Sequence, residues 1–311
     1  MLPRLSRQLA RHATRHLARV VPNVPAPTLG GMQFWNDCHI TTGGWRVQQH
    51  CLTEHHRLLT PSDVRRAWGS YDECRLAIPP REKNLAAGET VLCVHGLGRS
   101  RSSMEPMAAF LREAGYRVLS VGYASTRTTV DEQARIVVEI LHNGPPLEKV
   151  HWVGHSLGCL IARRYEALAR QHEGITPLGR VVMLAPPNQG SRLADRMAGQ
   201  LGASLLFRVV DGPAGQEIVA WDELEPTLAT PSDFGVIAGR FDPVSNPLLN
   251  EPSDLVVTVE ETKLAGQSDF ATVAHSHTLI MRRRDVMTMT RQFLQSGRFA
   301  EQPAEAAQVA P

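Results

Sequence analysis

The chain has 311 residues, 42% of them hydrophobic, and a formal net charge of +2 at pH 7. This length and apolar content predict one large domain with an extension, and the nearly balanced charge gives no reason to expect a nucleic-acid partner. No apolar run approaches a membrane span, and no signal-peptide core follows the N-terminal arginines, so we expect a cytoplasmic or peripheral membrane location.

Residues 1–27 are predicted to form a basic amphipathic segment. Residues 1–21 contain no acidic side chain, and their arginines recur every three or four positions with apolar side chains on the opposite side. Prolines at 22, 25 and 27 then end the helix. Residues 2–20 are therefore a candidate for peripheral contact with an anionic membrane. The alternatives are a solvated tail or a helix packed on the domain.

Residues 28–88 form a second piece, rich in tryptophan, cysteine and histidine. Its possible metal ligands are Cys38, His39, His50, Cys51, His55, His56 and Cys74. None of them has C-x-x-C or H-E-x-x-H spacing, which is the specific part of a zinc signal. We therefore predict no metal site here, and an extension that packs on the domain that follows. The odd total of five cysteines also differs from a secreted disulfide framework.

From Glu89 onward, strands alternate with helices, which predicts a mostly parallel sheet with helices on both faces. The predicted strands are Thr90–Val94, Arg117–Tyr123, Lys149–Val153, Arg180–Leu184, Phe234–Ala238 and Asp269–Ala274. The predicted helices are Ser102–Ala114, Thr129–Leu141, Leu157–His172 and Leu279–Leu294. We expect one domain over 89–298, a cap or lid near 191–232 where the alternation is interrupted, and a disordered tail over 299–311.

The most informative motif is Gly154-His155-Ser156-Leu157-Gly158, between a predicted strand and a predicted helix. This is the setting of a nucleophile elbow, a sharp turn that presents a serine hydroxyl. The turn is so tight that side chains two residues before and after the serine would collide with backbone, which explains both glycines. Ser156 is therefore the predicted nucleophile, and the following helix directs its free amides at the same point.

A serine nucleophile needs a base and an acid that orients the base, and in this kind of site the chain order is serine, acid, histidine. His277 stands in the loop before the last predicted helix, whereas His275 is expected within the preceding strand, so His277 is the predicted base. Asp242 and Asp254 are both loop aspartates that fit the order, and both are candidates for the acid.

The oxyanion of the reaction needs backbone donors. One is the amide of Leu157, directly after the nucleophile, and the other is expected in the loop after the first core strand. Leu97 is the candidate in that loop, where Gly96 and Gly98 allow close approach of the backbone. The spacing is not G-x-G-x-x-G and no P-loop lysine follows, which argues against a phosphate-binding loop.

Together these residues resemble the α/β-hydrolase superfamily, and within it bacterial triacylglycerol lipases and related deacylase-type esterases. The resemblance covers roughly residues 89–297. It rests on His95–Gly98, Gly154–Gly158, Leu184–Ser191, Ser253–Val257 and Ser276–Thr278. It implies an α/β-hydrolase fold with a lid, and it favours Asp254 as the triad acid. Lipases of this type often have glycine after that aspartate, where this chain has Leu255.

The motifs and the resemblance predict a hydrolase of carboxylic esters with an apolar acyl group. Ser156, Asp254 and His277 would act through an acyl-enzyme, without a cofactor, on a small-molecule or lipid ester. The alternatives are an acyltransferase that uses the same residues and a catalytically inactive binding module with the hydrolase fold. A nitrophenyl-ester assay distinguishes the inactive module from the enzyme.

Overall fold

A computed structural model describes residues 24–80, 88–191, 204–242 and 250–299. The basic segment predicted for residues 2–20 lies outside these ranges. The predicted tail lies outside them too, apart from Phe299, which is buried and packs against Phe293 at a ring distance of 5.0 Å. Within the described ranges, no helix has both the length and the apolar character needed to cross a bilayer.

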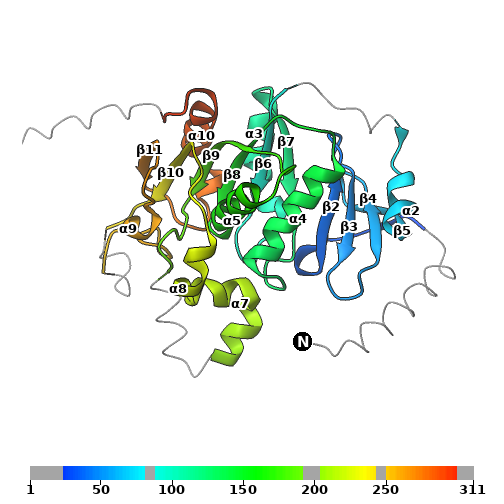
Figure 1. Ribbon diagram of the computed structural model, residues 1–311, viewed down its shortest axis with the longest axis horizontal. Coiled ribbons are helices and arrows are strands. Elements are labelled where there is room, and N and C mark those ends of the chain that lie inside the picture. The colour runs from blue at the N-terminus through cyan, green and yellow to red at the C-terminus, as the bar shows by residue number, and fades with distance from the viewer. Residues whose placement is uncertain (1–23, 81–87, 192–203, 243–249, 300–311) are drawn as a thin grey trace, which may run out of the picture.

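Six parallel strands form the central sheet, in the order β11-β10-β9-β8-β6-β7 (Figure 1). Their bounds are β6 Thr90–Val94, β7 Arg117–Val121, β8 Val150–His155, β9 Leu178–Leu184, β10 Phe234–Gly239 and β11 Asp269–Val273. Every residue of β6, β8 and β10 is buried. Burial on both faces explains why these strands are continuous apolar runs in the sequence rather than alternating ones.

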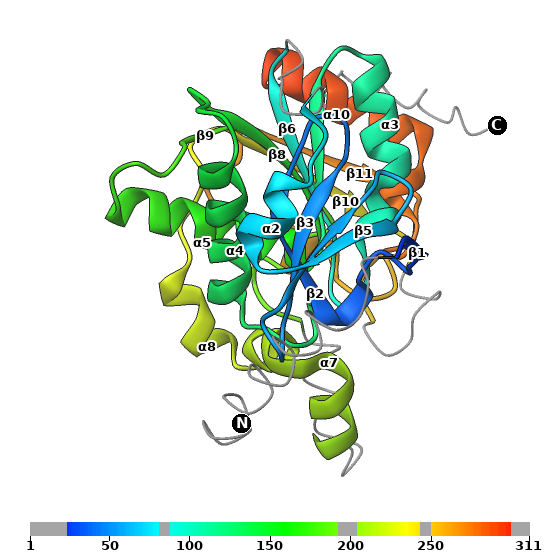
Figure 2. The same cartoon turned by 90° about the vertical axis from the view of Figure 1, so that its right-hand side faces the viewer.

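Helices cover both faces of this sheet (Figure 2). α4 (Val130–Asn143) and α5 (Leu157–Gln171) share one apolar cluster with the strands, and α3 (Glu105–Glu113) and α10 (Arg284–Ser296) share the other. The predicted fold class, a parallel sheet with helices on both faces, is confirmed.

Two of the predicted helices are divided. The structure has a 3₁₀ turn before each, namely η3 Arg101–Met104 and η6 Ile280–Arg282. The regular part of the predicted helix Ser102–Ala114 begins only at Glu105. Pro106 then lies in the first turn of α3, where an amide has no partner within the helix and its absence costs no hydrogen bond. Arg283 is extended and separates η6 from α10, which divides the predicted helix Leu279–Leu294.

The extension forms a separate antiparallel sheet in the order β1-β5-β4-β3-β2, which lies beside α4 through β2 (Figure 1). Its elements are β1 Ala26–Pro27, η1 Met32–Phe34, β2 Trp35–Ile40, β3 Arg46–His50, β4 His56–Leu59, β5 Val64–Gly69 and α2 Tyr71–Leu76. Val47, Leu58 and Ile78 are part of a small apolar core of its own.

A buried carboxylate joins this sheet to the hydrolase core. Asp37, on β2, is completely buried, and its Oδ2 accepts hydrogen bonds from Arg46 Nη1 at 2.5 Å and from the Gly122 amide at 2.7 Å. Its Oδ1 accepts a third from Gln48 Nε2 at 2.8 Å. Burial lowers the pKa of Arg46, and the negative charge of Asp37 opposes that shift. The ion pair lies within the extension, and the hydrogen bond from the Gly122 amide to Asp37 ties the extension to the loop after β7.

The insertion predicted near 191–232 is helical where it is described. It contains α7 Ser204–Val219, α8 Trp221–Leu224 and η4 Glu225–Thr227, and a further short helix, α9 Val259–Thr262, follows β10. α7 is kinked at Gly212, which has φ +66°. A Cβ there would lie 1.8 Å from the carbonyl oxygen of Thr126, so only glycine lets α7 reach the loop after β7. Ala214 and Ile218 of α7 join the apolar cluster under α4 and α5.

Candidate active site

Ser156 sits in a strained turn between β8 and α5, with φ +53° and ψ −119°. Non-glycine residues adopt positive φ rarely, and they do so mainly where the surrounding structure enforces it. A Cβ on Gly154 would lie 2.7 Å from the carbonyl oxygen of Gly158, and one on Gly158 would lie 2.4 Å from that of Val94. The turn therefore needs glycine at both positions, for the steric reason predicted from the motif.

Three predicted residues meet at the carboxyl ends of the parallel strands. His277 Nε2 lies 3.0 Å from Ser156 Oγ, and His277 Nδ1 lies 2.6 Å from Asp254 Oδ2. Asp254 is fully buried, His277 is 8% exposed, and Ser156 is half-buried. In this arrangement the imidazole can accept the hydroxyl proton while the carboxylate holds its other nitrogen.

The Asp254 loop fixes both its own carboxylate and the histidine. Asp254 Oδ1 accepts hydrogen bonds from the amides of Val256 at 2.9 Å and Val257 at 2.7 Å, which leaves Oδ2 for His277. The His277 amide donates to the Asp254 carbonyl at 2.9 Å. Leu255 has φ +81°, a left-handed conformation that disfavours a side chain by roughly 1–2 kcal/mol. Glycine would adopt this conformation without that cost.

The two candidate acids lie in different surroundings. Asp242 is exposed in the loop after β10, whereas Asp254 contacts His277. Gly239, at the end of β10, makes room for the second loop, because a Cβ there would lie 2.5 Å from Asp254 Cβ and 2.3 Å from the His275 carbonyl oxygen. This glycine was not singled out from the sequence.

The expectation that His275 lies within the last strand is wrong. β11 ends at Val273, and the chain turns there, with the His275 amide bonded to the Val273 carbonyl at 2.8 Å. The His275 ring faces Asp285, with Nε2 2.8 Å from Oδ2. The turn directs His275 to the surface and His277 to the serine.

The two predicted oxyanion donors lie on either side of the serine. Leu157 is the first residue of α5, and Leu97 is half-buried in the loop after β6. That loop lies against the nucleophile, since a Cβ on Gly96 would lie 3.2 Å from Ser156 Cβ. Gly98 has open space around its Cβ position but a φ of +67°, so its backbone conformation, not space, requires glycine. Within the described ranges, neither leucine amide donates a hydrogen bond.

His155 packs against His277 and contacts its backbone carbonyl, an arrangement that the sequence did not reveal. It is buried at the end of β8, its Nε2 lies 2.9 Å from the His277 carbonyl oxygen, and the two rings are 4.9 Å apart. Burial, and then the nearby His277, hold the pKa of His155 well below its usual value. The ring is therefore neutral, and its N–H donates to the backbone that carries His277.

Gln33 of the extension holds the loop after β6. Its Nε2 donates to the Arg99 carbonyl at 2.8 Å, and its Oε1 accepts the Thr126 amide at 2.9 Å and the Ser125 hydroxyl at 3.2 Å. That same hydroxyl oxygen accepts the Gly98 amide at 3.0 Å. Motif reading could not find this residue, because its partners lie 66 and more positions along the chain.

All five cysteines are free thiols, and burial raises the pKa of Cys93 to about 12 and also raises that of Cys159. In the extension, the rings of His50 and His55 stack at 5.3 Å, and both contact the Thr53 hydroxyl. Across the described residues, no group of three or more histidine, cysteine or acidic side chains is arranged to hold a metal ion.

A family model described as the alpha/beta hydrolase family matches residues 91–307. The chain belongs to this family. The predicted resemblance is thereby confirmed at the level of the superfamily. The match begins at β6 and therefore does not include the antiparallel sheet.

Solved structures similar to this hydrolase include bacterial lipases and esterases. The mature lipase BlEst2 from Bacillus licheniformis has 17% identity and a TM-score of 0.52, covering 71% of this chain and 96% of the lipase. A metagenomic carboxyl esterase has 17% identity and a TM-score of 0.47, covering 68% and 70%. Phospholipase PlaB from Legionella pneumophila has 22% identity and a TM-score of 0.43, covering 57% and 46%. At these identities the likeness concerns the fold. No curated protein matches the chain.

Proposed function

We propose that this hydrolase cleaves carboxylic esters that carry an apolar acyl group, with Ser156, His277 and Asp254 as its catalytic triad. The observation that carries the proposal is the continuous chain of contacts from Asp254 Oδ2 through both nitrogens of His277 to Ser156 Oγ. It ends at a hydroxyl that a strained turn presents next to the start of α5. The geometry is that of an activated serine nucleophile.

In the proposed reaction, Ser156 Oγ attacks the ester carbonyl carbon while His277 Nε2 accepts the hydroxyl proton. The amides of Leu97 and Leu157 stabilise the resulting oxyanion, an effect worth roughly 3–4 kcal/mol per donor in measured cases. The carbon–oxygen bond to the alcohol then breaks, and His277 protonates the leaving alcohol. Water, deprotonated by His277, attacks the acyl-enzyme and releases the acid. Asp254 stabilises the imidazolium that forms in each half-reaction.

The preference for an apolar acyl group is supported by the surroundings of the oxyanion loop. Leu97 packs against the apolar cluster that also contains Ala214 and Ile218 of α7. The helical insertion therefore contributes apolar surface to the cluster on which the catalytic loop rests. A small-molecule or lipid ester would place its acyl chain against the exposed part of Leu97, because burying apolar area is favourable.

A fluorophosphonate probe followed by intact-mass measurement tests the nucleophile. We expect one adduct, mapped to the peptide that contains Ser156, and no adduct with Ser156→Ala. A panel of nitrophenyl esters of increasing chain length then tests the reaction, and the wild type should hydrolyse it while Ser156→Ala should not. Undiminished hydrolysis by Ser156→Ala would refute the triad. Acyl transfer to an added alcohol in preference to water would identify an acyltransferase instead.

A further inference from the structure

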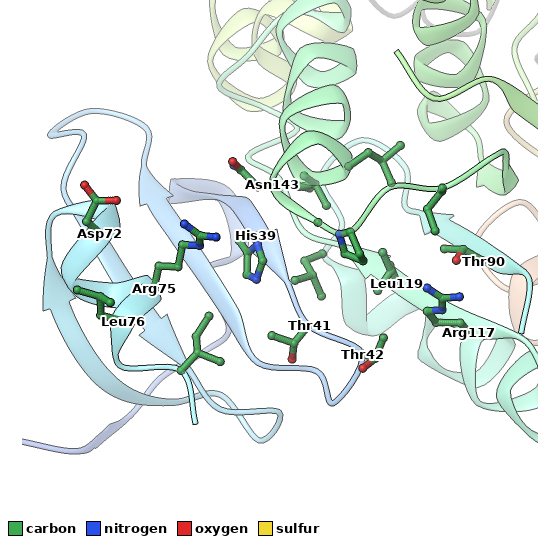
Figure 3. A pocket seen from close by; sticks show the side chains of 17 residues that line it. His39, Thr41, Thr42, Asp72, Arg75, Leu76, Thr90, Arg117, Leu119 and Asn143 are labelled. Atoms are coloured by element: carbon green, nitrogen blue, oxygen red, sulfur yellow. The ribbon is translucent and has the colours of Figure 1, made fainter. Parts of the chain in front are cut away.

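A cavity of about 610 Å³ lies between the extension and the hydrolase core (Figure 3). Its walls come from β2, α2, the starts of β6 and β7, and the end of α4. Thr90 and Arg117 are the first residues of β6 and β7, whereas Ser156 follows the last residue of β8. Because the strands are parallel, the cavity lies at their amino ends and the triad at their carboxyl ends, on opposite sides of the sheet's length. The cavity is therefore not part of the proposed catalytic site.

Most of the cavity wall is apolar. The apolar side chains include Ile40, Ile78, Leu119, Ile140, Leu141 and Leu147. Small-molecule sites in proteins typically have volumes of about 300–1,000 Å³, apolar walls and a few polar groups that fix orientation. Both the size and the wall of this cavity fit such a site for a ligand with an extended apolar part.

Two buried donors stand side by side at one end of the cavity. Thr90 and Arg117 are direct partners in the register of β6 and β7, so their side chains project from neighbouring positions of the sheet. Thr90 is 3% exposed, and among the described residues neither its Oγ1 nor the buried Nε of Arg117 has a hydrogen-bond partner. Arg117 Nη2 donates to the Gly88 carbonyl at 2.7 Å, which orients the guanidinium. Buried polar groups without a partner are destabilising, so these two donors favour a ligand that accepts from both.

The charges around the cavity favour a monoanion. Arg75 and Arg117 are opposed by Asp72 alone among the charged side chains in the described wall, which leaves one net positive charge. Burial lowers the pKa of His39, so this imidazole is neutral at pH 7 and does not add to that charge. A carboxylate has one negative charge and two oxygens, and it forms strong hydrogen bonds with a guanidinium.

We propose that this cavity binds a straight-chain carboxylic acid. Its carboxylate accepts hydrogen bonds from Thr90 Oγ1 and Arg117 Nε, and its alkyl chain lies along the apolar wall. The ligand contacts both the antiparallel sheet and the parallel sheet. Its binding therefore stabilises the folded state and raises Tm. The inference concerns a second site and does not depend on the proposed reaction.

Calorimetric titration of the full chain with dodecanoate and with dodecan-1-ol tests the carboxylate contacts. Thr90→Val keeps the shape of the buried side chain, and Arg117→Met keeps much of its length. Each should weaken dodecanoate binding about tenfold or more and leave dodecan-1-ol binding unchanged. Arg112→Met, on α3 at the opposite face of the sheet, is the matched control and should change neither. Equal dodecanoate affinity in all four proteins, or no binding to the wild type, would overturn the proposal.

Photo-crosslinking with a diazirine-bearing dodecanoic acid tests the location. Adducts should map to peptides that contain 40–42 or 140–147, and unlabelled dodecanoate should compete for them. Leu147→Trp, at a half-buried loop position in the wall, should block both dodecanoate and dodecan-1-ol by filling the cavity. Adducts confined to the peptides around Ser156 and His277 would place the ligand in the catalytic site and overturn the proposal.

Discussion

Asp254 and Asp37 are both completely buried and both hold a basic side chain, yet one lies in the candidate active site and the other between two sheets. The partner of Asp254 is an imidazole, which has two ring nitrogens, one facing the carboxylate and the other a serine hydroxyl. The partner of Asp37 is the guanidinium of Arg46, which keeps its proton, and the other partners are an amide side chain and a backbone amide.

The difference shows that burial of an acid beside a base does not by itself indicate chemistry. A site for proton transfer needs a partner that can pass on a proton and a path to a reacting group. Asp254 satisfies both conditions through His277, whereas Arg46 and Gln48 hold Asp37 within the extension and the Gly122 amide joins it to the core. The variants below test this distinction, from the largest expected effect to the smallest.

Asp254→Asn should lower kcat by about 10⁴-fold, because the imidazole then loses the group that holds its tautomer and stabilises its charge. Asp242→Asn, at an exposed loop position, should stay close to wild type. Steady-state hydrolysis of a nitrophenyl ester measures both. A larger loss in Asp242→Asn than in Asp254→Asn would contradict the assignment of the acid.

Asp37→Ala should lower the free energy of unfolding by about 3–5 kcal/mol, because the buried Arg46 is left without its counter-charge. The kcat of the protein that remains folded should change only a few-fold. Urea denaturation and active-site titration separate the two effects. A fall in kcat as large as that of Asp254→Asn, without lost stability, would show that the two aspartates do not differ as described.

Gln33→Ala should reduce kcat about tenfold and leave KM nearly unchanged. A loosened loop misplaces the Leu97 amide, and the proposed contact of this amide with the oxyanion is made only in the transition state. Gln49→Ala, on β3 of the same sheet, is the control. Rate measurements at saturating and limiting ester give the two constants. Parallel losses in both variants would indicate a general effect of the extension rather than support of the loop.

Acid should destabilise the protein from about pH 6.5 downward. Burial lowers the pKa of His95 to about 4 and holds that of His155 well below its usual value. Between the unfolded and folded pKa values only the unfolded chain binds the proton, so stability is complete above pH 6.5. It then falls with pH by up to about 1.4 kcal/mol per unit for each histidine. Urea titrations at pH 7.5 and 5.5 measure the slope, and His155→Asn should reduce it. Equal wild-type stability at the two pH values would contradict the prediction.

Leu255→Gly should have the smallest effect. Glycine relieves the left-handed strain of roughly 1–2 kcal/mol but adds backbone entropy to the unfolded chain, so we expect a net gain of at most about 1 kcal/mol. Thermal unfolding measures this gain, and kcat should stay within about twofold. A clear loss of activity would show that the Leu255 side chain, 38% exposed, has a further role.

The sequence by itself determined the parts of the protein whose causes are local. The elbow can be read from Gly154, Ser156 and Gly158 because its sterics involve a few adjacent residues and one neighbouring strand. The parallel sheet follows from apolar runs that must be buried on both faces. The expected place of His277 in the loop before the last helix selected it as the base, although the expectation that His275 lies within the strand was wrong.

Only the tertiary structure decided which distant segments meet. It brought Asp254 rather than Asp242 to His277, through a close approach that Gly239 permits. It also placed Gln33 on the loop after β6 and Asp37 on the loop after β7, over separations of 66 and 85 positions. No periodicity or motif encodes such contacts, because buried polar side chains are stabilised by partners that only folding supplies.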